Sequence, residues 1–288
     1  MSENIRVQDV SDTALWVATY RAKESERPDA LFRDPLAKRL SGDRGQKIAE
    51  LLGSSGIMYW VMVIRTIAID RLILKAIDLG VDTVVNLGAG LDTRPYRMKL
   101  PKQLKWVEVD FPNMIDFKTH KLKGETPVCQ LERMSVDLSK EAARKAVFQK
   151  IGDASSKVLI ITEGVIPYLA NDDAESLAKA IHAVPSFRYW IQDFSDLSLR
   201  RRSPRSFRKH LKDAPFQFRT HDWLGFFTKL GFKVNEIISA VDQSREIARP
   251  FPIPFPWNVL FNLQTPKMKK KWYENFNKRM GYVLFEKS

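Results

Sequence analysis

Residues 83–112 read TVVNLGAGLDTRPYRMKLPKQLKWVEVDFP, and this stretch decides the fold class. The apolar run at residues 84–87 stops at Gly88-Ala89-Gly90, which is typical of a buried strand followed by a tight turn. A second run, Trp106-Val107-Glu108-Val109, ends in Asp110. The stretch therefore predicts the first β-α-β unit of a nucleotide-binding sheet, in which ligands lie beyond the carboxyl ends of the strands.

The glycine pattern narrows the class of ligand. Only two of the three glycines of the dinucleotide fingerprint are present, and Asp92 stands where the third would be. A bare G-x-G is more often an ordinary strand-to-helix turn, so the glycines alone give weak support for a ligand. A ligand with one ribose and no pyrophosphate fits better, and S-adenosylmethionine (SAM) is the common one. Asp110 is the acid that we expect to bind its ribose hydroxyls.

Three motifs carry a family resemblance: NLGAGLDTRPYR at residues 86–97, EVDFP at 108–112 and TEGVIPYL at 162–169. They resemble the leucine carboxyl methyltransferase family of SAM-dependent enzymes. The block at residues 12–37 and the arginine of VIRTIAID, Arg65, extend the resemblance. These blocks fall in order along the first part of the chain, and the remainder matches only loosely. The resemblance implies SAM as cofactor and a turn at Gly88, Ala89 and Gly90 that approaches it.

The predicted fold is α/β, a Rossmann-like class I methyltransferase with a seven-stranded, mostly parallel sheet and helices on both faces. A chain of 288 residues is long enough for one such domain with an insertion. We expect a single domain, 1–288, with four parts. They are an N-terminal helical extension (1–80), a SAM-binding core (81–194), a lid or substrate insertion (195–220) and the C-terminal part of the sheet (221–288).

Cysteine and histidine usage argues against disulfides and metal sites. The single cysteine, Cys129, excludes an intrachain disulfide and suits a reducing cytoplasm. The four histidines have no paired metal-ligand spacing; they are His120, His182, His210 and His221. The polar start of the chain lacks the apolar core of a signal peptide, and the apolar stretch at 57–64 is too short to span a bilayer. We expect no membrane partner.

The formal net charge of +13 is the one compositional feature that bears on partners. Basic residues gather at 118–123, 200–209 and 267–271, and each cluster is more often a solvated helix face than a binding patch. None has the aromatic interleaving of an RNA platform, so a nucleic-acid partner is not expected. The run at 200–209 is interpreted as a lid that faces an acidic acceptor, with a binding patch as the alternative.

Arg65 and Arg21 are the candidates for binding the methionine carboxylate of SAM. Arg65 lies within an apolar helix predicted from about residue 56 to residue 79, where an unpaired guanidinium would be costly. It is either a structural ion pair, perhaps with Asp70, or a planar bidentate donor for a carboxylate. The family resemblance favours the carboxylate role for Arg65 and leaves Arg21 open between the two.

Two further strand ends contribute candidates. Residues 134–138 resemble the family's third strand, where Asp137 would accept a hydrogen bond from the adenine amine and Leu138 would contact the ring. Asp137 equally suits the N-cap of a helix from residue 139. The strand at 157–162 ends at Glu163, which could hold the SAM amine, orient the substrate or act as a base. The resemblance supports the first role.

The resemblance predicts a SAM-dependent enzyme that methylates a carboxylate oxygen of a small molecule or protein. A carboxylate acceptor needs positioning and exclusion of water more than a strong base. Three alternatives stay open: a tRNA-modifying enzyme, a non-catalytic SAM-binding scaffold, and a hydroxyl O-methyltransferase. The last requires a general base such as His210, His221 or Glu163. The acceptor itself and the oligomeric state are not predicted.

Overall fold

The computed structural model describes residues 10–52, 56–196, 215–253 and 255–288. The basic run at 200–209, interpreted above as a lid, lies outside the described residues. Most of the predicted insertion at 195–220 lies outside them as well. Its role therefore stays a prediction.

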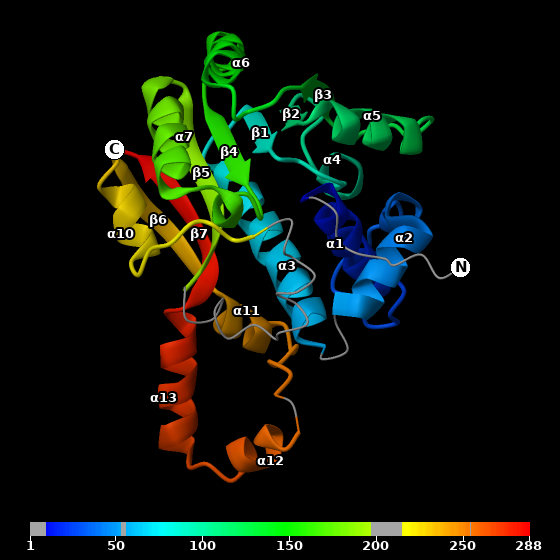
Figure 1. The fold of residues 1–288 in the computed structure, drawn as a ribbon, viewed down its shortest axis with the longest axis vertical. Coiled ribbons are helices and arrows are strands. Elements are labelled where there is room, and N and C mark those ends of the chain that lie inside the picture. The colour runs from blue at the N-terminus through cyan, green and yellow to red at the C-terminus, as the bar shows by residue number, and fades with distance from the viewer. Residues whose placement is uncertain (1–9, 53–55, 197–214, 254) are drawn as a thin grey trace.

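A seven-stranded sheet forms the centre of the molecule, in the order β3-β2-β1-β4-β5-β7-β6 (Figure 1). The strands are β1 (Thr83–Leu87), β2 (Lys105–Asp110), β3 (Gln130–Ser135), β4 (Val158–Thr162), β5 (Phe187–Ser195), β6 (Phe232–Ser239) and β7 (Met280–Lys287). The pairs from β3 to β5 are parallel, and β7 runs antiparallel to both β5 and β6. The predicted seven-stranded, mostly parallel sheet is confirmed.

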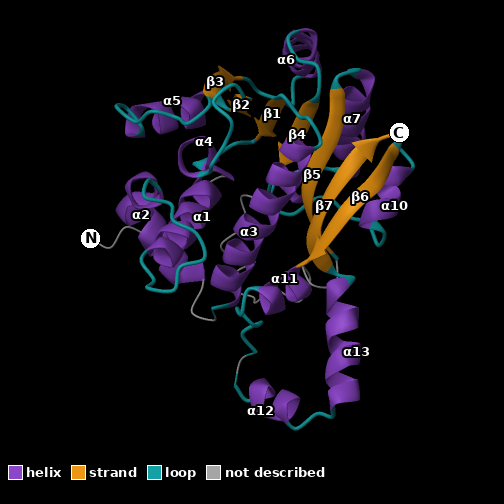
Figure 2. Cartoon of the chain, turned by 180° about the vertical axis from the view of Figure 1, so that it is seen from behind, coloured by secondary structure: helices purple, strands orange, loops and turns teal. Residues whose placement is uncertain are grey.

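Helices cover both faces of this sheet (Figures 1 and 2). The helices of the described residues are α1 (Val10–Ser25), α2 (Ala37–Leu52), α3 (Ile57–Asp78), α4 (Arg94–Arg97), α5 (Pro112–Lys121), α6 (Glu141–Asp153), α7 (Asn171–Ala183), α10 (Trp223–Thr228), α11 (Ala240–Glu246), α12 (Trp257–Asn262) and α13 (Pro266–Asn277), with a 3-10 turn η1 (Ile166–Tyr168). Helix α3 lies on one face, whereas α6, α7 and α10 lie on the other.

The period-2 alternation of the strands produces two cores. In β1, Val84 packs with α3, while its neighbours Val85 and Leu87 pack with the α6 and α7 side. All five residues of β1 and of β4 are buried, as expected for central parallel strands with helices on both faces. The carboxyl ends of these two strands are thus held by cores on either side.

Two local predictions need correction. The third strand is Gln130–Ser135 rather than 134–138, because it pairs in register with all of β2. Lys118 does not lie on a solvated face: it is fully buried and its Nζ donates to Glu108 Oε1 at 2.7 Å. Glu108 lies on β2, the strand that precedes α5 in the chain.

Within the described ranges, the helices are all too short or too polar to cross a lipid bilayer.

Candidate functional site

The glycine turn after β1 allows only small residues. Gly88 and Gly90 have φ angles of +66° and +45°, a region that L side chains rarely adopt. A Cβ on Gly88 would lie 2.7 Å from Val165 Cγ2, and one on Gly90 would lie 3.3 Å from Ala14 Cβ. Ala89 between them is buried, and the N–H groups of Gly88 and Ala89 donate to the carbonyl of Val109 at 2.8 and 3.3 Å.

Asp110 ends β2 next to this turn, as predicted. Its Oδ2 accepts from the N–H of Gly90 at 2.7 Å, and its Oδ1 accepts from the N–H of Phe111 at 2.8 Å. Burial raises the pKa of Asp110, although these two N–H groups oppose the rise. The acid and the turn thus form one unit, with a carboxylate directed at the backbone that a ribose would approach.

Arg94 is the centre of a buried charge network that the sequence reasoning missed. Its Nε donates to Asp70 Oδ1 at 2.6 Å and its Nη1 donates to Glu163 Oε2 at 2.7 Å. The same Nη1 donates to Asp92 Oδ2 at 3.0 Å, and burial of Asp92 is outweighed by Arg94, which holds the pKa of that carboxyl below its usual range. Asp92, which replaces the third glycine, therefore ties the turn to α4.

Arg65 reaches the same network from α3. Its Nε lies 2.8 Å from Glu163 Oε1, and its Nη1 lies 3.7 Å from Asp193 Oδ2. The Nε–Glu163 contact is close in distance but poorly aligned, so Nε is left without a hydrogen bond. Asp70, considered above as a partner for Arg65, instead binds Arg94 and Arg97. Arg65 thus has an ion pair and an N–H group that is not satisfied by it.

Gly164, directly after Glu163, allows this close approach. Its φ is +65°, and a Cβ there would lie 3.3 Å from Arg65 Nη1. Its N–H donates to Asp193 Oδ1 at 2.7 Å, which fixes the acid at the end of β5. Asp193 is a second group that the sequence reasoning missed, although the rule that selected Asp110, an acid at a strand's carboxyl end, also applies to it.

The two acids beside Arg65 differ in protonation behaviour. Burial would raise the pKa of Glu163, but Arg94 and Arg65 outweigh burial and hold it below the ordinary value. For Asp193, burial prevails over Arg65 and the N–H of Gly164, so its pKa is raised. Glu163 is therefore firmly ionised, while Asp193 is the more basic carboxylate of the pair.

Arg21 binds protein groups through its Nε and Nη2 atoms. Its Nε donates to Asp34 Oδ2 at 2.8 Å and its Nη2 donates to the carbonyl of Leu91 at 2.5 Å. Asp34 Oδ2 also accepts from the hydroxyl of Thr93 at 2.6 Å. Arg21 thus attaches α1 to the segment after the glycine turn, and a role toward the cofactor carboxylate stays a prediction.

Asp137 and Leu138 lie between β3 and α6, both partly buried. Asp137 Oδ1 accepts from the N–H of Ser139 at 3.0 Å and from its hydroxyl at 2.6 Å, and these bonds lower the pKa of Asp137. The helix begins at Glu141, so Asp137 caps a turn before the helix rather than the helix itself. Its second oxygen has no recorded partner in the described chain. The adenine role of Asp137 stays a prediction.

Tyr282 of β7 places a hydroxyl group without a hydrogen-bond partner next to Asp193 on the neighbouring strand, among the described residues. It pairs in register with Asp193, is 1% exposed, and its hydroxyl has no hydrogen-bond partner among the described residues. Tyr168 of η1 is also enclosed: burial raises its pKa to about 12, and its ring packs at 5.1 Å from that of Phe216.

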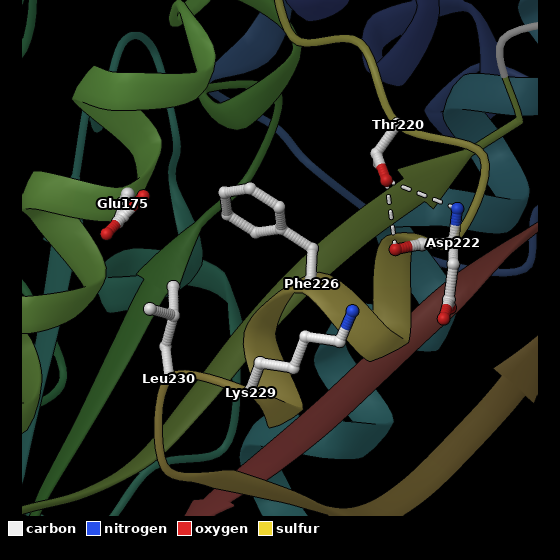
Figure 3. A pocket seen from close by; sticks show the side chains of 6 residues that line it. All are labelled: Glu175, Thr220, Asp222, Phe226, Lys229 and Leu230. Atoms are coloured by element: carbon white, nitrogen blue, oxygen red, sulfur yellow. Dashed lines mark hydrogen bonds between the residues drawn. The ribbon is translucent and has the colours of Figure 1, made fainter.

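A hollow of about 240 Å³ lies elsewhere, between α7 and α10 (Figure 3). Its lining combines charged, polar and apolar side chains: Glu175, Thr220, Asp222, Phe226, Lys229 and Leu230. In the close view the Thr220 hydroxyl bonds only to the backbone of Asp222, and none of these residues belongs to the charge network described above. Within the described residues, the candidate cofactor-binding side chains therefore lie at the carboxyl ends of β1, β2, β4 and β5 and not around this hollow.

Proteins that are similar in sequence have names that agree with the predicted class of enzyme. A relative from Parafrankia sp. (strain EAN1pec), named "Putative S-adenosyl-L-methionine-dependent methyltransferase", is 31% identical over 265 residues, 86% of this chain and 84% of the relative. A relative of the same description from Streptomyces coelicolor is 35% identical over 193 residues, 62% of this chain and 66% of the relative. With the sheet and the glycine turn, these matches define a SAM-dependent methyltransferase, an enzyme whose cofactor is SAM.

The leucine carboxyl methyltransferase family matches residues 14–182, more than half of the chain. The chain belongs to this family, as the motifs predicted. A solved "putative methyltransferase" from Thermobifida fusca YX superposes with a TM-score of 0.60 at 12% identity, covering 99% of this chain and 97% of that chain. A DUF574 family protein from Streptomyces avermitilis gives a TM-score of 0.57 at 13% identity, covering 94% and 97%. Such likeness shows the fold alone, that of a class I methyltransferase.

Proposed function

We propose that this enzyme transfers the methyl group of SAM to a carboxylate oxygen of its acceptor. The observation that carries the proposal is the position of Glu163, which is held between Arg65 and Arg94 with its pKa lowered. A carboxylate stabilised in this way is a weak general base. An acceptor that arrives already ionised does not need one.

The positions of the histidines, the other bases considered for a hydroxyl acceptor, also support a carboxylate acceptor. Among the described histidines, His120 and His221 are exposed, and the ring of His182 packs against Phe232 at 5.6 Å. His210 lies outside the described residues. The part of the site that the structure describes thus offers acids and guanidinium groups rather than imidazole.

The residues present fit SAM. The turn leaves backbone without side chains at Gly88 and Gly90, and Asp110 stands beside it to accept hydrogen bonds from two ribose hydroxyls. We propose that Arg65, through the N–H left without a bond, holds the methionine carboxylate, while Glu163 accepts from the amine. Arg21, Asp137 and Leu138 keep the cofactor roles given above, as part of this proposal.

The chemistry required of the protein is modest. Bound SAM supplies an electrophilic methyl group on a sulfonium sulfur. A C–O bond to the acceptor carboxylate forms as the C–S bond breaks, the bond pair goes to sulfur, and no proton is released. The chain must hold the oxygen in line with the methyl group and exclude water. The buried acids and arginines at the ends of β4 and β5 set a fixed electrostatic environment for that approach.

The test uses radiolabelled SAM and a panel of carboxylic acids, phenols, alcohols and tRNA. Carboxyl methylation gives an ester that mild base hydrolyses to volatile labelled methanol, whereas ethers and methylated bases keep the label. Base-labile label on a carboxylic acceptor is the expected result. Label that survives base treatment on every accepted substrate would overturn the proposal, and SAM binding without any transfer would favour a scaffold.

One observation favours a second candidate, methylation of a hydroxyl. Asp193 has a raised pKa and lies within 3.7 Å of Arg65, so it could accept the proton of an alcohol or phenol. Asp193→Asn separates the two reactions. It should remove the rise of hydroxyl methylation with pH that ionisation of Asp193 produces, but leave the pH profile of carboxylate methylation unchanged in shape.

A further inference from the structure

Residues 249–253 and 255–279 form a projection, here called the arm, that extends from the body beyond β6 and β7. Helices α12 and α13 make up most of it, and both views show them projecting away from the sheet (Figures 1 and 2). The arm follows α11 and leads directly into β7. It contains none of the residues assigned above to the cofactor.

An aromatic cluster fixes the arm to the body. Phe251 packs at 5.0 Å from Trp60 of α3, and at 5.1 Å from Phe276 of α13. Trp272 stacks on Phe276 at 5.2 Å and meets Phe261 of α12 at 5.1 Å. These inward rings use one side of the arm, so its shape does not depend on the remaining apolar side chains.

The remaining apolar side chains are exposed at the outer end. Phe255 is 80% exposed, Leu263 78% and Trp257 64%. Val259, Leu260 and Met268 are about half exposed or more, and all six lie within residues 255–268. Scattered exposed apolar residues are ordinary, but six in one short segment form a patch that is costly to leave in water.

The patch is bordered by positive charge. Residues 255–279 contain six basic residues and one acidic residue, Glu274. Lys267, Lys270 and Lys271 are exposed, and their ammonium groups pair with no carboxylate in the described part of the chain. The outer end of the arm therefore combines bulky apolar side chains with unneutralised lysines.

This combination selects one kind of partner. A second copy of the chain would bring its own +13 charge against the lysines, which opposes self-association. Peptides and small ligands are usually held in concave sites, whereas this patch lies on a projection. Lysine with Trp, Phe and Leu on a protruding helical segment is typical of binding at the interface of an anionic lipid bilayer.

We propose that the arm binds anionic membrane surfaces. The side chains of Phe255, Trp257 and Leu263 enter the headgroup region, and Lys267, Lys270 and Lys271 contact the negative headgroups. The enzyme then acts as a peripheral protein, in contrast to the expectation from sequence of no membrane partner. The inference is independent of which oxygen the enzyme methylates.

Vesicle flotation with the full chain tests the proposal. The protein should float with vesicles of phosphatidylcholine and phosphatidylserine, but not with phosphatidylcholine alone, and added salt should weaken binding. Trp257→Ser with Leu263→Ser should lower the partition coefficient at least about tenfold, since both side chains leave water on binding. Lys270→Glu with Lys271→Glu should lower it at least about tenfold, because each lysine near an anionic surface contributes about fivefold.

Matched controls change the same residue types elsewhere. Leu74→Ser with Phe117→Ser alters two exposed apolar residues of α3 and α5, and Lys102→Glu with Lys229→Glu reverses two exposed lysines. Both controls should bind vesicles within about threefold of the parent, because they leave the arm intact. Circular dichroism and SAM titration establish that every variant folds.

Four outcomes would overturn the proposal. The first is a parent protein that floats with no vesicle. The second is arm variants that bind as well as the controls. The third is a parent that sediments as a dimer and becomes a monomer on Trp257→Ser with Leu263→Ser without binding vesicles, which would make the patch a self-association surface. Salt-sensitive binding to tRNA in place of vesicles, lost with Lys270→Glu and Lys271→Glu, would assign it to nucleic acid instead.

Discussion

Glu163→Gln tests the charge network most directly, because the change keeps the shape of the side chain and removes only its charge. In the parent, Glu163 Oε1 lies 2.8 Å from Arg65 Nε and Oε2 accepts from Arg94 Nη1 at 2.7 Å. The glutamine amide cannot neutralise two guanidinium groups. The variant should therefore be less stable, with both arginines less well compensated.

The size of the effect follows from what each arginine keeps. Removing one partner of a buried ion pair costs about 3–5 kcal/mol. Arg94 retains Asp70 and Asp92, and Arg65 retains Asp193 at 3.7 Å, so we expect the low end, about 3 kcal/mol. At about 2–4 °C per kcal/mol for a domain of this size, the Tm should fall by about 6–12 °C.

Thermal unfolding without SAM measures the change, with Glu132→Gln as the control. Glu132 pairs with Lys150 on the surface, where loss of an ion pair costs about 1 kcal/mol or less. Arg65→Met with Glu163→Gln should be less destabilised than the sum of the single changes, since neither charge is then left alone. A Tm for Glu163→Gln within about 2 °C of that for Glu132→Gln would refute the reasoning.

The stability difference between the parent and Glu163→Gln should depend on pH. The folded pKa of Glu163 lies below its ordinary value of 4.5, so its contribution to stability is fully present above that value. As pH falls below 4.5 and through the lower folded pKa, the parent loses this contribution while the variant has none to lose. The stability difference between them should shrink with acid, as measured by urea unfolding at several pH values, and growth of the difference would contradict the assignment.

Three further predictions concern cofactor binding. Asp110→Ala should weaken SAM binding by about 1–3 kcal/mol in calorimetry, the scale for lost hydrogen bonds to a charged group, and unchanged affinity would remove the ribose role. Arg65→Lys should fold normally but bind SAM poorly, because an ammonium group does not replace a planar fork; a collapsed Tm with normal affinity would indicate a structural role instead. Gly88→Ala should lower both stability and SAM affinity, and Val165→Ala should restore only the part due to the 2.7 Å contact, because the strain at a φ of +66° remains. Full restoration, measured by thermal unfolding and SAM titration, would exclude backbone strain.

The parts of the fold that the sequence predicts are those with short-range causes. The β1 run, the glycine turn and the acid at the end of β2 lie within residues 83–112, and the structure places them together as expected. Helix α3 and strand β4 are long or apolar enough to be recognised by periodicity alone. The local sequence pattern therefore suffices to predict the strands, the helix and the turn that position the site.

What the sequence could not show are pairings between distant residues. Arg94 meets Asp70 and Glu163, which are 24 and 69 positions away, and no local pattern joins them. Lys118 lies in a helix of low amphipathicity among other lysines, so its burial depends on Glu108 of a neighbouring strand. The cofactor roles of Arg21, Asp137 and Leu138 rest on the family motifs and stay predictions.

The register of the last two strands has a consequence for how this enzyme can vary. Ser239 at the end of β6 lies opposite Gly281 at the start of β7, so residues 240–280 leave and rejoin the sheet at the same point. The sheet therefore places little constraint on the length of that excursion, because the entropy of closing a loop grows only slowly with its size. Descendants of one ancestral sequence could lengthen, shorten or exchange this segment while keeping every strand pair. The match to the family ends at residue 182, so residues 240–280 lie in the part of the chain that the family model does not cover.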